Sequence, residues 1–165
     1  MPVPSITPSL WFDHNLEEAA TFYTSVFPNS RIEEYNRCTD AGPGEPGTVL
    51  SGTFVLDGTR FIGINGGPYF SFSEAVSFTI DCKDQDEVDY YWDRLTDGGT
   101  QSQCGWCKDR YGLSWQVVPQ RLYELVNHPD PARATAATRA MHGMRKIIVA
   151  DLERAADEAL GGPEG

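Results

Sequence analysis

The pattern of apolar and polar residues near the N-terminus predicts a strand followed by an amphipathic helix. Apolar and more polar side chains alternate over Ile6–Phe12, which indicates a strand. Asn15 and Glu18 have the spacing of a capping box at the start of a helix. Apolar residues then recur at helical spacing over Leu16–Phe27, and Pro28 ends the segment.

Three more strands are expected to complete a first module. They are Arg31–Arg37, Val49–Leu56 and Arg60–Asn65. A loop rich in glycine and proline separates the first two, and Asp57-Gly58 is a strong hairpin signal between the last two. The order of elements is therefore β-α-β-β-β.

The same pattern then starts again, which predicts a second β-α-β-β-β module. Alternation over Val76–Asp81 indicates a strand, and Asp84 with Glu87 predicts the start of a helix that ends near Gly98. Short strands follow at Thr100–Gln103, Gly105–Lys108 and Leu113–Val118. Leu10 and Phe12 correspond to Phe78 and Ile80, 68 residues later, and the helix residues correspond at 69. A duplication explains this agreement.

Beyond Pro119 the pattern becomes helical. Short helices are expected near Leu122–Val126, Ala132–Met144 and Ala150–Leu160. We therefore predict an α+β fold, in which two modules (about 5–66 and 74–119) form curved mixed sheets around a cleft. Residues 1–119 make up this domain, and residues 120–165 form a C-terminal helical extension.

The faces of the predicted sheets suggest where a ligand binds. Leu10, Phe12, Phe78 and Ile80 face the helices, and alternation places Ile62, Ile64, Leu113, Trp115 and Val117 outward in the same way. The opposite faces are small and polar with a few aromatic residues, which suits a ligand cavity, although a partly solvated sheet face would give the same pattern. The cleft candidates are Thr7, Ser9, Trp11, Phe61, Asn65, Ser77, Thr79, Trp106, Ser114 and Gln116.

Charge and composition exclude several classes of partner. The chain of 165 residues has 24 acidic and 13 basic side chains, so its field repels nucleic acids and anionic membrane surfaces. No apolar run approaches the roughly 18–20 residues of a membrane span. The first residues have no basic or apolar region typical of a signal peptide. A cytoplasmic protein with reduced thiols is expected.

Cys104 and Cys107 form a Cys-x-x-Cys motif, which occurs in redox and metal sites. The flanking residues predict strands, whereas a thioredoxin-like dithiol needs a helix start, and Cys38 and Cys82 are too isolated to complete a zinc site. We interpret the motif as a coincidence. No serine stands in a nucleophile elbow. Asp13, Asp81, Asp109 and Tyr111 are predicted at strand ends and turns, where solvated carboxylates are ordinary.

Several segments together resemble the PhnB-like branch of the vicinal oxygen chelate superfamily, which includes glyoxalase I, extradiol dioxygenases and bleomycin- and fosfomycin-resistance proteins. They are Ile6–Phe12, Phe22–Ser30, Phe54–Gly58, Asn65–Pro68, Cys104–Trp106, Lys108–Gly112 and Ser114–Pro119. The resemblance implies paired β-α-β-β-β modules around a cleft, usually in a homodimer.

The resemblance also implies positions for a divalent metal, on the first and last strands of each module. Here these positions are Thr7, Ala75, Gly63 or Asn65, and Gln116, which offer neither imidazole nor carboxylate. His14, His128 and His142 lie elsewhere and are interpreted as surface residues. We therefore expect no metal and no cofactor.

Members of this branch often have the name of a demethylubiquinone methyltransferase, but the sequence lacks a Gly-rich turn after a parallel strand. The sequence predicts a protein that binds a small organic molecule between its modules without the usual metal. An enzyme acting on a small organic substrate is the alternative, either without a metal or with an unconventional one. A dimer with a vestigial cavity is a third possibility.

Overall fold

The computed structural model describes residues 6–160. Residues 1–5, whose composition predicts no signal peptide, and residues 161–165 lie outside the described part. The described residues form five helices and two four-stranded mixed sheets, which confirms the predicted α+β class. The chain divides into a first unit that ends at Phe72 and a second unit that begins at Ser73.

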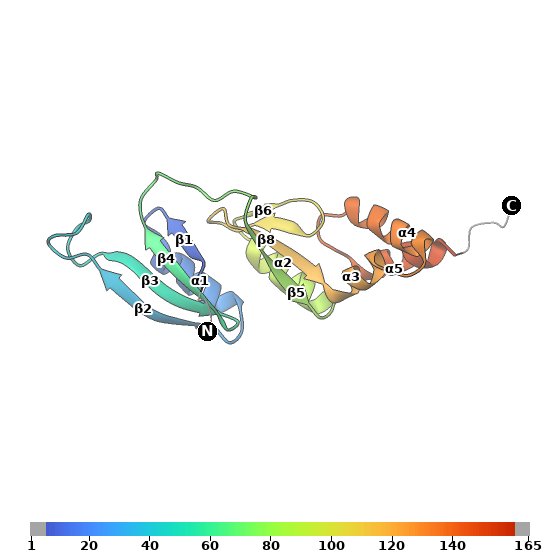
Figure 1. Cartoon of the computed structure of the whole chain (residues 1–165), viewed down its shortest axis with the longest axis horizontal. Helices are drawn as coiled ribbons and strands as arrows, with labels where there is room; N and C mark the ends of the chain where they lie inside the picture. The colour runs from blue at the N-terminus through green and yellow to red at the C-terminus, as the bar shows by residue number, and fades with distance from the viewer. Residues whose placement is uncertain (1–5, 161–165) are drawn as a thin grey trace, which may run out of the picture. The chain divides into compact units, whose positions relative to one another are not determined.

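The first unit contains one sheet and one helix, which can be followed in Figure 1. Its elements are β1 (Ser9–Phe12), α1 (Leu16–Val26), β2 (Arg31–Arg37), β3 (Val49–Leu56) and β4 (Thr59–Asn65). The strand order is β1-β4-β3-β2, in which β1 pairs parallel to β4 and the other pairs are antiparallel. β1 begins three residues later than predicted.

The second unit repeats this arrangement. Its elements are β5 (Ser77–Cys82), α2 (Gln85–Thr96), β6 (Thr100–Gln101), β7 (Trp106–Lys108) and β8 (Ser114–Pro119). The order β5-β8-β7-β6, with β5 parallel to β8, matches the first sheet strand for strand. The predicted repeat of β-α-β-β-β modules is confirmed.

The two module helices begin in different ways. At α2 the Asp84 side chain accepts a hydrogen bond from the backbone N–H of Glu87 (3.0 Å), so the predicted cap forms. At α1 the Asn15 side chain makes no capping hydrogen bond. The Asn65 side chain at the end of β4 accepts from the Leu16 N–H instead (3.0 Å). Asn15 is therefore at the N-cap position as predicted, but the expected capping bond from its side chain does not form.

The predicted face assignment of β4 is also wrong. Phe61, Gly63 and Asn65 were expected on the open face, but they lie on the face that α1 covers. Phe61 is 4% exposed and stacks on Phe54 with 5.6 Å between ring centroids. A Cβ atom on Gly63 would lie 2.0 Å from Leu16 Cδ1, so glycine makes room for the first helical residue. The segment is apolar on both faces, and alternation therefore does not determine its orientation.

The packed face of the second sheet agrees with the prediction. Cys107 and Val117 are fully buried and Trp115 is 3% exposed, so they form the packed face, and α2 packs against β7 and β8. Trp106 and Gln116, which alternate with these residues, lie on the opposite face and are half-buried.

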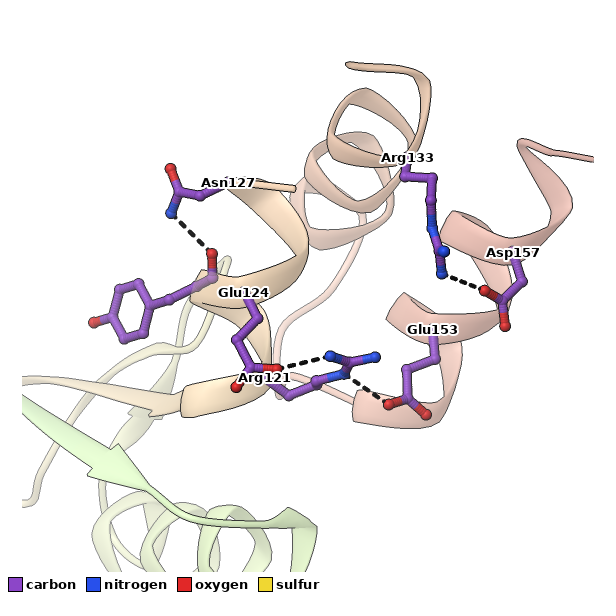
Figure 2. Close-up of polar contacts among 7 residues, drawn as sticks. Arg121, Glu124, Asn127, Arg133, Glu153 and Asp157 are labelled. Carbon is purple, nitrogen blue, oxygen red and sulfur yellow. Dashed lines mark hydrogen bonds and ion pairs between the residues drawn. The ribbon is translucent and has the colours of Figure 1, made fainter. Parts of the chain in front are cut away.

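Three helices follow β8: α3 (Gln120–Val126), α4 (Pro131–His142) and α5 (Val149–Glu158). They share an apolar core with the end of β8: Val118, Leu122, Leu125, Ala137, Ile147, Leu152 and Ala156. Figure 2 shows the polar contacts around this core, where Arg121 binds Glu124 of α3 (2.7 Å) and Glu153 of α5 (2.9 Å). Across residues 6–160, every helix is too short or too polar to cross a membrane.

The segment between α4 and α5 attaches these helices to the second module. The backbone N–H groups of Cys104 and Gly105 donate to the carbonyl oxygens of Met144 and Arg145, both at 2.8 Å. The Gln85 side chain donates to the Ile147 carbonyl oxygen (3.1 Å) and accepts from the N–H that starts α5 (2.8 Å). The helical extension is therefore hydrogen-bonded to the loop that leads into β7.

Candidate functional site

The register of the second sheet brings six side chains together on its open face. Two cross-strand rows run over β7, β8 and β5: Lys108, Ser114 and Ser77 in one, and Trp106, Gln116 and Thr79 in the other. Directly opposed residues in a sheet have Cβ atoms about 4.5–5.5 Å apart. We call this set of six residues the polar face. All but Lys108 were predicted from sequence.

Gln116 lies at the centre of the polar face and is held by a neighbour. Its Nε2 donates a hydrogen bond to Ser77 Oγ at 2.9 Å, which fixes the plane of the amide. The amide oxygen accepts no hydrogen bond from any residue within 6–160. Gln116 therefore presents an oriented acceptor and lies directly opposite Trp106 on the adjacent strand.

Ser114 adds a hydroxyl group without a partner. The residue is 1% exposed, and its Oγ makes no hydrogen bond within the described part of the chain. A buried hydroxyl without a partner costs about 1–3 kcal/mol. A ligand group or a water molecule that bonds to Ser114 Oγ would recover this energy.

Lys108 supplies the positive charge of the polar face. Its Nζ lies 2.6 Å from Glu74 Oε1, and the two side chains are 34% and 64% exposed. The hydrogen bond from Lys108 is the main reason why the pKa of Glu74 is lowered from its ordinary value. Sequence alternation from Trp106 could have placed Lys108 on this face, whereas no sequence signal indicated Glu74.

The predicted residues of the first unit do not form a comparable set. Ser9 is exposed and Thr7 lies before β1 begins. Phe61 is in the core, and both ends of the Asn65 amide are used, since its Nδ2 donates to the Val49 carbonyl oxygen (3.0 Å). Of this group, Trp11 and Asn65 line a cavity, and Trp11 lies on the open side of the sheet.

Trp11 forms one wall of a cavity of about 990 Å³ within the first unit. Its Nε1 donates to the Gly67 carbonyl oxygen (2.9 Å), and its ring contacts Phe70 edge-on at 4.9 Å between centroids. Charged side chains are among the lining residues, including Glu17 and Arg37, whose charged groups are 3.9 Å apart. Sequence analysis did not predict this cavity.

The positions at which the superfamily commonly holds a metal do not fit a divalent cation. Thr7 and Ala75 offer no strong ligand, and both ends of the Asn65 amide are hydrogen-bonded to backbone groups. Only Gln116, a neutral amide, offers an oxygen, whereas divalent cations prefer carboxylate and imidazole ligands. No group of three or more His, Cys, Asp or Glu side chains within residues 6–160 could hold a metal ion.

Asp109 differs from its sequence interpretation as a solvated turn residue. It is 3% exposed, and Oδ1 accepts from the N–H groups of Tyr111 (2.8 Å) and Leu113 (3.1 Å). Its Oδ2 accepts from Trp115 Nε1 (2.9 Å). Asp109 therefore organises the turn between β7 and β8 and does not belong to the polar face.

The two cysteines of the Cys-x-x-Cys motif have different environments, and we expect them to react differently. Cys107 is fully buried, and burial raises the pKa of its thiol to about 12, while Cys104 is half-buried. At pH 8 a thiol-alkylating reagent should therefore modify Cys104 in the native protein and Cys107 only after unfolding. Cys82, whose pKa burial also raises to about 12, serves as the internal control. Peptide mass spectrometry measures the labelling, and formation of a Cys104–Cys107 disulfide in the native protein under mild oxidation would contradict the prediction.

Comparison with known proteins gives one family and several similar structures. The model of the 3-demethylubiquinone-9 3-methyltransferase family matches residues 4–118. A Bacillus cereus protein, named PhnB and given the same methyltransferase label, is 34% identical, with a TM-score of 0.64 over 70% of this chain and 99% of its own.

Two more distant structures share the fold alone. PA1353 from Pseudomonas aeruginosa is 19% identical (TM-score 0.60, 71% of this chain and 98% of its own). FosX, a fosfomycin resistance protein from Listeria monocytogenes, is 14% identical (TM-score 0.52, 75% and 98%). No curated protein matches this sequence. The family match ends before α3, so the C-terminal helices lie beyond it.

Proposed function

Because the chain belongs to the PhnB-like branch of the vicinal oxygen chelate superfamily, we propose that it binds a small organic molecule without the usual metal. The proposed binding surface is the polar face of the second unit. Its Gln116 occupies a position at which the superfamily commonly carries a metal-ligating glutamate. Here the amide would bind the ligand directly by a hydrogen bond.

The observation that carries this proposal is the Gln116–Ser77 hydrogen bond of 2.9 Å. It fixes the amide, so that the Gln116 carbonyl oxygen is an oriented acceptor before any ligand arrives. Preorganised groups lose less entropy on binding. Trp106, on the adjacent strand β7, offers a flat apolar wall. Ser114, on β8 with Gln116, offers a hydroxyl without a partner. A planar molecule with hydrogen-bonding groups fits this combination.

The methyltransferase label of the family does not describe this arrangement. Methyltransferases of the usual kind bind their cofactor at a Gly-rich turn between a strand and a helix. Here the turns from β1 to α1 (residues 13–15) and from β5 to α2 (residues 83–84) contain no glycine. The Gly-rich segment Gly42–Gly47 connects the antiparallel strands β2 and β3. We therefore do not propose methyl transfer.

Binding of small planar probes to the full-length protein tests the proposal. We expect phenol, catechol and benzamide to shift the indole N–H signal of Trp106 in ¹H–¹⁵N spectra. Gln116→Ala should weaken binding about threefold to tenfold, as expected for one lost hydrogen bond. The matched control is Gln101→Ala, an exposed amide on the edge strand of the same sheet, which should leave affinity unchanged.

Two results would contradict the proposal. Probe-induced shifts confined to the Trp11 indole would place binding in the cavity of the first unit. Stoichiometric zinc, nickel, manganese or iron in the purified protein, lost in Gln116→Ala, would show that Gln116 ligates a metal after all.

A further inference from the structure

The Lys108–Glu74 ion pair points to the chemical class of the ligand. We propose that the ligand carries a carboxylate, that Lys108 binds this group, and that Glu74 competes for the same lysine in the unliganded protein. This inference rests on the proposed function, because it places the ligand on the polar face.

The position of Lys108 distinguishes it from the other lysines in exposed ion pairs. Lys83, for example, pairs with Glu87 one helical turn away, on the surface at the start of α2 (3.3 Å). Lys108 instead lies directly opposite Ser114 across the β7–β8 pair, in the cross-strand row that continues to Ser77. Its charge therefore belongs to the polar face, whereas that of Lys83 does not.

The partner of Lys108 already shows which group fits there. Glu74 comes from the short segment before β5, its side chain is 64% exposed, and its carboxylate oxygen lies 2.6 Å from Nζ. An exposed ion pair of this kind contributes only about 0–1 kcal/mol, so a ligand carboxylate can replace Glu74 at small cost. The space beside Lys108 thus accepts a carboxylate at hydrogen-bonding distance.

Ser114 gives the ligand carboxylate an advantage over Glu74. Its buried Oγ makes no hydrogen bond within the described part of the chain. Glu74 pairs with Lys108, directly opposite Ser114, but leaves the Ser114 hydroxyl without a partner. A carboxylate has two oxygens, so one of them can accept from Lys108 and the other from Ser114. A ligand whose ring stacks on Trp106 would present its carboxylate to both groups, since these residues lie in adjacent rows.

Local charge is also needed because the protein as a whole repels anions. The formal net charge is −11, so an anionic ligand is retained only where a cation is close. Within the polar face Lys108 is the one basic residue. A single ammonium group matches the single charge of a carboxylate better than the double charge of phosphate.

Benzoate and its neutral analogue benzamide test this inference in the full-length protein. We expect benzoate to bind more tightly than benzamide, with the Trp106 indole signal as the readout. Lys108→Met should weaken benzoate binding about tenfold and leave benzamide binding unchanged. Glu74→Gln, which removes the competitor, should strengthen benzoate binding about threefold. Raising the salt concentration should weaken benzoate binding alone.

Matched variants separate the proposed roles from a general effect of charge. Lys83→Met removes one positive charge and Glu124→Gln removes one negative charge, each from an exposed ion pair of the second unit outside the polar face. Both should leave the ratio of benzoate to benzamide affinity unchanged. The free energy of unfolding of every variant, measured in urea, identifies any loss of folding.

The possible failures are distinguishable. Equal affinity for benzoate and benzamide at Trp106 would overturn the inference, and so would a benzoate affinity that Glu74→Gln does not raise. Either result would leave the proposed function standing. If inorganic phosphate binds more tightly than benzoate, the site prefers a different anion, and the inference of a carboxylate ligand is also overturned. If neither aromatic probe shifts Trp106, both the proposed function and this inference are wrong.

Discussion

Replacing Ile147 by alanine is expected to lower the free energy of unfolding of the second unit by about 2–4 kcal/mol. Ile147 is fully buried in the core shared by Val118 of β8 and the three C-terminal helices. Alanine would leave a cavity there, because the surrounding core residues of β8 and the helices relax only partially around a removed side chain. A loss of this size is a large fraction of the roughly 5–15 kcal/mol by which a domain is stable.

The effect should also reach the loop that carries Trp106. The segment Met144–Ile147 accepts hydrogen bonds from the N–H groups of Cys104 and Gly105 and from the Gln85 side chain. A Cβ atom on Gly105 would lie 3.2 Å from Ile147 Cγ1, so the isoleucine packs directly on this loop. We therefore expect faster amide hydrogen exchange at Cys104 and Gly105 in Ile147→Ala.

The neighbouring isoleucine provides the control. Ile148 is only half-buried and precedes α5, so Ile148→Ala should cost less than about 1 kcal/mol. Urea unfolding followed by circular dichroism measures both variants. Equal losses for the two variants, or unchanged exchange at Gly105 in Ile147→Ala, would show that the helices are not coupled to the β7 loop.

The repeat made most of the fold predictable from sequence. The strand and helix periods of the two modules agree after a shift of 68 or 69 residues, so each module supports the interpretation of the other. The observed sheets have the same strand order, and the elements begin and end near the predicted residues. Local periodicity is a strong signal when one face of each element is buried.

β4 shows where this signal fails. This strand has apolar residues on both faces, with Phe61 on one and Ile62 and Ile64 on the other. Alternation therefore carries no information about which face of β4 the helix covers. The orientation depends instead on contacts between distant residues, namely the space that Gly63 leaves for Leu16 and the bond from the Leu16 N–H to Asn65. Such contacts between residues about 50 positions apart have no local sequence pattern.

The candidate site was predicted in part for a related reason. β8 alternates clearly, which placed Ser114 and Gln116 on one face, and the structure brings them together with Ser77 and Trp106. Glu74 lies in a connecting segment where apolar and polar residues follow no periodic pattern, so only the folded chain shows that its side chain reaches Lys108. Burial of a charged residue in a turn, as at Asp109, is also set by tertiary packing.

Replacing Asp109 by alanine is expected to cost about 3–5 kcal/mol of the free energy of unfolding. The buried carboxylate accepts hydrogen bonds from the N–H groups of Tyr111 and Leu113 and from the Trp115 indole. Alanine would leave these donors without their acceptor in a site that is 3% exposed. Hydrogen bonds to a charged acceptor are stronger than neutral ones, so the loss exceeds that of an ordinary turn residue.

Asp109→Asn and Asp97→Ala make the test specific. Asparagine keeps the shape and one carbonyl acceptor, so Asp109→Asn should cost less than Asp109→Ala, yet the indole N–H signal of Trp115 should still shift. Asp97 is a nearby exposed aspartate paired with Arg110 (3.3 Å), and Asp97→Ala should cost less than about 1 kcal/mol. Urea unfolding gives the free energies and ¹H–¹⁵N spectra give the indole signal. If Asp109→Ala costs no more than Asp97→Ala, the carboxylate does not hold the β7–β8 turn in place, and the packing of Trp115 must depend on its apolar contacts alone.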